Sequence, residues 1–221
     1  MIVACEGIDG AGKNTLVTAI EKELVEREKP VALVSFPRYN DSVHAQLARS
    51  ALYGGMGDLV DSACGMATLF ALDRAEIADD IAELSEDGYF VLIDRFVASN
   101  AAYTAARSGW DGQSPSQDNP TVSWIAELEF ERLGIPVPDL HIFLSTPPRL
   151  ASERAVAREG EDASRARDAF EKDSDLQRRT AAAYEALARD QWQSPWVVVK
   201  PGEVTRQATE VVDAILRHHA H

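Results

Sequence analysis

The sequence has few cysteines, a deficit of basic residues and no long apolar run. Two cysteines, Cys5 and Cys64, do not make a disulfide framework, and we expect each to be a small buried apolar residue. Lys and Arg number 22 against 36 Asp and Glu, giving a formal net charge of −14. That balance argues against nucleic acid or an anionic membrane as a partner. With no secretion signal pattern at the N-terminus and no apolar run of membrane-spanning length, we expect a cytoplasmic location.

The strongest local signal is the stretch GIDGAGKNT, residues 7–15, between an apolar run at 2–5 and a helical pattern. A strand, a glycine loop and a helix in this order are typical of the phosphate-binding motif G-x-x-x-x-G-K-[ST]. Glycines let backbone N–H groups approach oxyanions, and the helix N-terminus and a lysine add positive charge. We therefore expect the loop to bind a polyphosphate through Gly7, Gly10, Gly12, Lys13, Asn14 and Thr15.

Asn14 departs from this motif, because it replaces the hydroxyl residue that usually helps to hold magnesium. The alternative interpretation of the loop is an ordinary glycine-rich turn with an incidental lysine. The position of the loop directly after a predicted buried strand favours the phosphate site.

The order of the elements predicts the fold class. Five apolar runs, at 2–5, 31–34, 90–93, 140–144 and 196–199, alternate with helical patterns. This alternation predicts an α/β fold with a parallel sheet covered on both faces. Together with the glycine loop it indicates a three-layer sandwich of the P-loop NTP hydrolase type, with a five-stranded parallel sheet. A hydrophobic fraction of 45% and a length of 221 residues fit a single domain over 1–221.

Two segments should lie beside the loop, because ligands of open α/β sheets bind beyond the carboxyl ends of the strands. The run 31–34, which we expect to be buried on both faces, ends in FPRY at 36–39. The run 90–93 delivers Asp94 and Arg95 at its end. The alternative for this charged pair is a structural ion pair.

The helical patterns carry further candidates. We expect one helix from 58 to 86, in which Phe70 and Arg74 share a face. Phe70 alone would be a core residue, but Arg74 needs a partner, and a ligand could be one. A helix over Val97–Arg107 makes Asn100 and Tyr103 neighbours, and the loop-like stretch 109–120 is expected to be a flexible excursion.

Six arginines gather between residues 154 and 179, around the acidic stretch 159–162. Two helices joined by a mobile hinge would produce this pattern, and a solvated pair of surface helices is the alternative. So many arginines in an acidic chain favour an arginine-rich lid, at about 154–171, which closes over the phosphates.

These motifs together resemble the thymidylate kinases, the mycobacterial form in particular. The resemblance rests on the loop 7–15, FPRY, FALDR at 70–74, DRFVASNAAY at 94–103 and RARDAFE at 165–171, and it covers essentially the whole chain. It implies a five-stranded parallel sheet and a homodimer. It also implies transfer of the γ-phosphoryl group of ATP to thymidine 5′-monophosphate (dTMP) with Mg²⁺, in dTTP biosynthesis.

The resemblance also implies roles for single residues. In the acceptor site, Phe70 stacks on thymine, Arg74 and Asn100 read the base edge, and Tyr103 crowds the 2′ position, which favours deoxyribose. The acceptor nucleotide is expected to contact Asp9, Phe36, Arg38, Tyr39, Phe70, Arg74, Asp94, Arg95, Asn100, Tyr103, Asp168 and Phe170.

For the phosphates, the resemblance makes Arg95 the grip on the acceptor phosphate, near Tyr39 and assisted by Arg38. Asp9 meets the acceptor directly or through Mg²⁺, and Asp94 orients Arg95 or a metal-bound water. The charge needed for transfer is expected from Lys13, Arg95, Arg158 and Arg165, with Arg154 on ATP. Phe170 stands where the mycobacterial lid has a tyrosine.

Two other functions stay open at this point. A deoxynucleoside kinase would phosphorylate an acceptor that has no phosphate, which leaves Arg95 and FPRY without a purpose. A nucleotide-dependent switch protein would bind nucleotide tightly without acceptor turnover, and the lid arginines argue against it.

Overall fold

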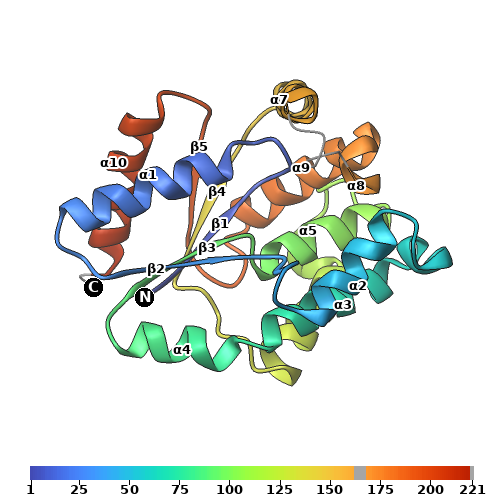
Figure 1. The fold of residues 1–221 in the computed structure, drawn as a ribbon, viewed down its shortest axis with the longest axis horizontal. Helices are drawn as coiled ribbons and strands as arrows, with labels where there is room; N and C mark the ends of the chain where they lie inside the picture. The colour runs from blue at the N-terminus through green and yellow to red at the C-terminus, as the bar shows by residue number, and fades with distance from the viewer. Residues whose placement is uncertain (162–167, 220–221) are drawn as a thin grey trace.

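A computed structural model describes residues 1–161 and 168–219 of the chain. At its centre lies a five-stranded parallel sheet in the order β2-β3-β1-β4-β5 (Figure 1). The expected sheet is confirmed, and every expected strand is present. The strands are β1 (Ile2–Glu6), β2 (Val31–Ser35), β3 (Phe90–Asp94), β4 (Leu140–Leu144) and β5 (Trp196–Val199).

Helices cover the sheet in two layers. On one side α1 (Lys13–Glu26) packs against α10 (Val204–His219), and on the other α5 (Val97–Arg107) packs against α9 (Ser174–Arg189) (Figure 1). The three central strands β3, β1 and β4 lie in the core, and every residue of β1 and β4 is buried. The α/β sandwich predicted from the alternating pattern is therefore correct.

The expectation that the second strand is buried on both faces is wrong. In β2 no residue is fully buried, and Leu33 is 47% exposed. β2 lies at the edge of the sheet and is paired only with β3. A continuous apolar run thus indicates a parallel strand but does not distinguish the centre of a sheet from its edge.

The expected helix over 58–86 is also wrong, because the chain breaks twice. It forms a 3₁₀ turn η1 (Gly57–Asp61), then α3 (Ala63–Ala75) and α4 (Ala78–Glu86). The Ser62 side chain accepts a hydrogen bond from the backbone N–H of Gly65 and so starts a new helix. Upstream, the Ser42 side chain caps α2 (Val43–Leu52) in the same way.

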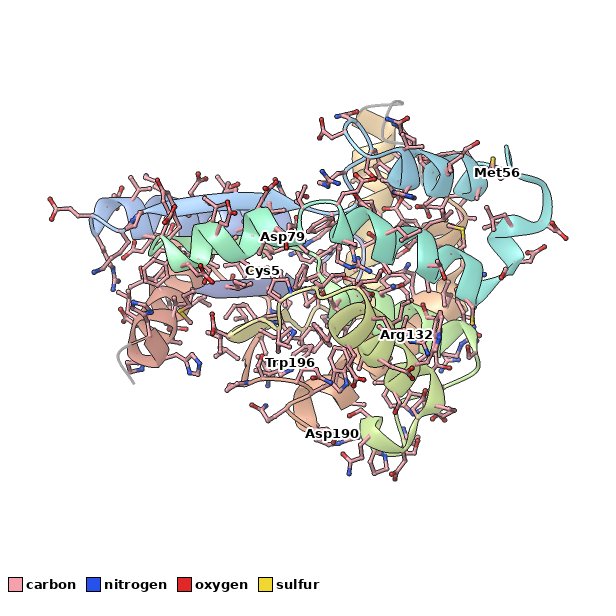
Figure 2. The ribbon with its side chains drawn as sticks, turned by 90° about the horizontal axis from the view of Figure 1, so that it is seen from below. Cys5, Met56, Asp79, Arg132, Asp190 and Trp196 are labelled. Carbon is pink, nitrogen blue, oxygen red and sulfur yellow. The ribbon has the colours of Figure 1, made fainter. Side chains whose placement is uncertain are left out.

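The stretch 109–120 is not a flexible excursion but a packed connection. Trp110 is buried, and the backbone N–H of Ser116 donates to Asp190 of the α9 C-terminus, labelled in Figure 2, at 2.7 Å. A Cβ at Gly112 would lie 2.4 Å from the carbonyl oxygen of Ala182. The stretch includes a 3₁₀ turn η2 (Ser116–Asp118) and leads into α6 (Pro120–Ala126), which a π-helical segment η3 (Glu127–Arg132) extends.

The arginine-rich region begins in α7 (Pro148–Glu161) and continues in α8 (Ala169–Lys172) and α9. The acidic stretch 159–162, where the hinge is predicted, begins inside α7, which continues to Glu161, and only residue 162 of that stretch lies outside the described residues. Arg178 and Arg179 both pair with Asp175 on the surface of α9, as the surface-helix alternative predicts for them.

The two cysteines differ in their surroundings. Cys5 is buried in the sheet, near the centre of the molecule (Figure 2), whereas Cys64 is exposed, so the expectation of a buried residue is wrong for Cys64. It lies in the first turn of α3, where the apolar stripe begins only with Met66. Within the described residues, no helix is long and apolar enough to cross a membrane.

Candidate active site

The glycine loop joins the end of β1 to the start of α1. Gly10 and Gly12 have positive φ angles of 74° and 100°, a backbone region in which a Cβ is unfavourable. A Cβ at Gly10 would also lie 2.1 Å from the carbonyl oxygen of Ala151 in α7. At the start of α1, Gly12 offers no side chain to cap the helix, so the first backbone N–H groups face the loop.

Lys13 is buried, and its ammonium group lies over the loop. The Nζ atom donates to the carbonyl oxygens of Gly7 and Ile8, each at 2.9 Å. Burial and the neighbouring Arg95 lower the pKa of Lys13 to about 8, against the opposing effect of Asp9. The side chain of Lys13 therefore loses its proton at a pH only slightly above neutral. An anion bound in the loop would favour the charged form of the lysine.

One arginine of the predicted lid reaches the loop in the described residues. Arg154 of α7 donates from Nη1 to the carbonyl oxygen of Ala11 at 3.0 Å, beside Gly12. Arg158 also belongs to α7, but its side chain lies outside the described part, and Arg165 lies outside it altogether.

A pocket opens beside the loop, between α2, α3, α5 and α8. It brings together most of the residues predicted for the acceptor and adds others that the sequence did not single out. The predicted ones are Asp9, Phe36, Tyr39, Phe70, Arg74, Arg95, Asn100, Tyr103, Asp168 and Phe170, and the additional ones include Leu52, Met66, Ser99, Thr104 and Arg107.

Asp9 connects the loop to this pocket. One of its carboxylate oxygens pairs with Arg95, and the other accepts a hydrogen bond of 2.6 Å from the Tyr103 hydroxyl. Arg95 follows β3 with a positive φ of 65°, which turns its side chain back toward the loop. Burial, followed by the charge of Asp9, raises the pKa of Tyr103 well above its usual value. A carboxylate, a guanidinium and a phenol thus meet where the two halves of the site join.

At the far end of the pocket, Arg74 has a protein partner. Its Nε and Nη2 atoms donate to the two oxygens of Glu129 at 2.5 and 2.7 Å. The Nδ2 atom of Asn100 donates to Glu129 at 2.7 Å and to the carbonyl oxygen of Ala67 at 2.9 Å. The sequence indicated that Arg74 needs a partner, but Glu129 lies 55 residues away and no local pattern marks it.

Two predicted residues do not line the pocket. The Arg38 guanidinium is held by Asp73 and Glu76, at 3.1 and 2.5 Å, so it does not point to the acceptor phosphate as expected. Asp94 makes no hydrogen bond to Arg95 in the described residues, and its Oδ1 is buried without a hydrogen-bond partner there. The expected orientation of Arg95 by Asp94 therefore lacks a direct contact.

The helix α8, which belongs to the predicted lid, contributes Phe170 to the lining of the pocket. Phe170 stacks on Tyr103 with ring centroids 6.2 Å apart, and the Arg107 guanidinium lies 4.7 Å from the Phe170 ring. Asp168 caps α8 by accepting from the backbone N–H groups of Phe170 and Glu171. Burial raises the pKa of Asp168 to about 6, and the charge of Asp9 acts in the same direction.

A divalent cation would find carboxylate oxygens here but not a complete set of ligands. No group of three or more His, Cys, Asp or Glu side chains that could hold a metal occurs in the described ranges. Mg²⁺ is usually held by one or two carboxylates together with phosphates and water. Asp9 and the Asp94 oxygen that has no hydrogen-bond partner among the described residues fit that requirement.

Comparisons with known proteins agree on one family. The family profile described as thymidylate kinase matches residues 5–209. The thymidylate kinase of Mycobacterium tuberculosis (strain ATCC 25618 / H37Rv) is 44% identical over 199 residues, which cover 90% of this chain and 91% of that protein. A probable thymidylate kinase of Thermococcus kodakarensis is 31% identical, covering 85% of this chain and 84% of that protein.

Proposed function

Because the chain belongs to the thymidylate kinase family, we propose that the loop 7–15 binds the phosphates of ATP and that the adjoining pocket binds dTMP. The protein is a phosphotransferase that converts dTMP to the diphosphate with ATP as donor, in dTTP synthesis. The resemblance expected from the motifs, with its fold and its reaction, is confirmed. The roles of individual residues in this reaction are the proposal.

The observation that carries the proposal is the position of Asp9. It belongs to the glycine loop, yet it lines the acceptor pocket and contacts Arg95 and Tyr103 there. A phosphate held by Arg95 would therefore lie next to the phosphates held by the loop. Phosphoryl transfer needs this alignment of donor and acceptor more than it needs covalent help from the protein.

In the acceptor half, we assign the thymine base to the end of the pocket with Phe70, Arg74 and Asn100. The Phe70 ring stacks on the base, and the two polar side chains meet its edge. Tyr103 contacts the sugar near C2′, where a ribose hydroxyl would be crowded, and Arg95 with Tyr39 holds the phosphate. Each of these residues lines the pocket, which supports the assignment.

In the donor half, Lys13 and the N–H groups of α1 contact the ATP phosphates, and Arg154 approaches them from α7. Closure of the lid, residues 154–171, would bring Arg158 and Arg165 toward the transferred group. An arginine delivered in this way raises the rate of phosphoryl transfer by about 10³-fold or more in related systems. Closure also excludes water, which limits hydrolysis of ATP.

We assign Mg²⁺ to the carboxylates of Asp9 and Asp94 together with the phosphates. When bound, the ion neutralises charge on the phosphate oxygens. The buried Oδ1 of Asp94, which has no hydrogen-bond partner in the described part of the chain, supports this position. Asn14, in place of a hydroxyl residue, gives a further reason to seek the metal ligands among these aspartates.

For the whole protein we propose a single catalytic domain that forms a homodimer in the cytoplasm. Exposed apolar side chains on and beside α2, with Val43 63%, Leu47 37% and Tyr53 54% exposed, support a subunit interface there. Light scattering at micromolar concentration tests the dimer.

An assay of ADP release tests the acceptor assignment. We expect turnover with dTMP and dUMP and far less with the cytidine and guanosine monophosphates. Equal rates with all four acceptors would overturn the assignment of the pocket. Turnover of thymidine itself would instead indicate the deoxynucleoside kinase, and tight ATP binding without any turnover would indicate a switch protein.

A further inference from the structure

Glu129 is a buried carboxylate behind the base end of the pocket. It is 0% exposed, comes from the π-helical segment η3 and does not line the pocket itself. Arg74 donates to both of its oxygens, and Asn100 adds a third hydrogen bond. A buried charge requires such partners. All three donors belong to side chains that do line the pocket.

The neighbours of Asn100 fix the direction of its amide group. Nδ2 lies between two oxygens that only accept, the Glu129 carboxylate at 2.7 Å and the Ala67 carbonyl at 2.9 Å. Oδ1 accepts from the Thr104 hydroxyl at 3.3 Å and keeps a second lone pair. Exchanging the two amide atoms would set acceptors against acceptors, at a cost for buried groups. Within the described part of the chain, Asn100 therefore has acceptor capacity available for a ligand.

Glu129 constrains Arg74 in the same way. The guanidinium uses Nε and Nη2 on the carboxylate. The remaining nitrogen, Nη1, has no hydrogen-bond partner among the described residues, so its N–H donors are available to the pocket. The polar edge of the pocket thus combines a donor from Arg74 with an acceptor from Asn100. Thymine and uracil present the complementary pair, a carbonyl at C4 and an N–H at N3. Cytosine presents an amino group at C4 and a bare nitrogen at N3, so both contacts would be mismatched.

We propose that Glu129 is a positioning residue that sets the base specificity of the kinase. It fixes the donor on Arg74 and the acceptor on Asn100, and so selects thymine and uracil over cytosine without touching the base. The inference rests on the function proposed for this pocket and deepens it.

The test is Glu129→Gln, with kcat and KM measured for dTMP, dUMP and dCMP. In either orientation, a glutamine amide must turn its NH₂ group toward a donor: toward Nε of Arg74, or toward Nη2 of Arg74 together with Nδ2 of Asn100. We expect the ratio of kcat/KM for dTMP to that for dCMP to fall by about tenfold or more, mainly through a higher KM for dTMP. The dUMP values should follow those of dTMP. A purely structural defect would lower kcat/KM by the same factor for all three acceptors and leave the ratio of dTMP to dCMP unchanged. An unchanged ratio would therefore overturn the proposal.

Two variants serve as controls. Glu127→Gln makes the same change two residues earlier in η3, where the side chain pairs with the exposed Arg132, labelled in Figure 2, and the ratio should stay at the wild-type value. Glu129→Asp keeps two oxygens that only accept, so its ratio should be closer to wild type than that of Glu129→Gln. A ratio for Glu129→Asp as low as for Glu129→Gln would contradict the proposed role of acceptor polarity.

A comparison on the wild-type protein covers the case in which Glu129→Gln does not fold. dTMP methylated at N3 cannot donate to Asn100, so it should bind at least about tenfold more weakly than dTMP. Equal affinity would overturn the proposal. Wild-type protein that does not phosphorylate dTMP would instead refute the proposed function of the pocket, so the two failures are distinguishable.

Discussion

Lys13 carries its charge in a buried position, and the consequence at the scale of the residue is a link between nucleotide binding and pH. Burial first, and then Arg95, lower its pKa to about 8, so in the free protein the ammonium form is lost as the pH rises through that value. The phosphates of ATP favour the charged form and raise this pKa again. Binding above pH 8 must therefore include uptake of a proton by Lys13.

Calorimetry of ATP binding at pH 8.5 to 9, in buffers of different ionisation enthalpy, measures this uptake. We expect a net uptake that declines toward pH 7.5. Lys13→Arg provides the control, because a guanidinium stays protonated throughout this range and should abolish the uptake. Uptake of the same size in that variant would assign the proton to another group.

For Arg95, the expected effect of removing the side chain follows from its contacts. Arg95→Ala takes away the proposed grip on the acceptor phosphate and leaves the Asp9 carboxylate without its guanidinium partner. We expect a higher KM for dTMP and a lower kcat, with kcat/KM reduced by about 10²-fold to 10³-fold. Steady-state kinetics with dTMP measures it, beside Arg132→Ala, which removes an exposed arginine. Unchanged kinetics in Arg95→Ala would refute its assigned role.

Tyr103 combines two roles that two variants can separate. Tyr103→Ala removes the ring proposed to crowd C2′, so the ratio of kcat/KM for dUMP to that for UMP should fall by about tenfold. Tyr103→Phe keeps the ring and removes only the hydroxyl that donates to Asp9 at 2.6 Å. This second variant should keep the sugar preference while lowering kcat. Loss of the sugar preference in both variants would assign the discrimination to the hydroxyl instead.

At the scale of the element, helix α5 carries the largest share of the pocket. Asn100, Tyr103, Thr104 and Arg107 all lie on it, and its start is fixed by Glu6, which accepts from the Phe96 backbone N–H at 2.9 Å. Residues three and four apart share a helix face, so the sequence could predict that Asn100 and Tyr103 act together. The pairing of Glu129 with Arg74 could not be predicted. Glu129 lies in a π-helical segment that no apolar periodicity in the sequence indicates.

The connection 109–120 packs closely against α9, and a substitution at Gly112 tests how much this close approach contributes to stability. In Gly112→Ala the new Cβ would meet the Ala182 carbonyl at 2.4 Å, and φ is already +75°. We expect a loss of about 1–3 kcal/mol in the free energy of unfolding, measured by denaturant titration. Gly109→Ala also has a positive φ but open space around the Cβ, so it should lose less. Equal losses in the two variants would exclude the close approach as the cause.

At the scale of the whole molecule, the strand order brings distant motifs together. β1 pairs with β3 so that Cys5 lies opposite Asp94, and the loop that follows β1 therefore meets Arg95. The rule that ligands bind beyond the carboxyl ends of parallel strands predicted this meeting without the strand order. The exposure of β2 could not be predicted, because it depends on which strand lies at the edge. The same holds for Arg38, whose partners Asp73 and Glu76 come from α3 and its end.

The unequal exposure of the two cysteines has a practical consequence. Burial raises the pKa of the Cys5 thiol, whereas Cys64 is open to solvent and lies near Arg107. A thiol-reactive fluorophore will therefore attach to the natural chain at Cys64, on the same helix as Phe70 and near the arginine that covers Phe170. The natural chain therefore offers a site for attaching a fluorophore near Arg107 and Phe170, two residues that line the pocket, so that changes there can be followed in real time.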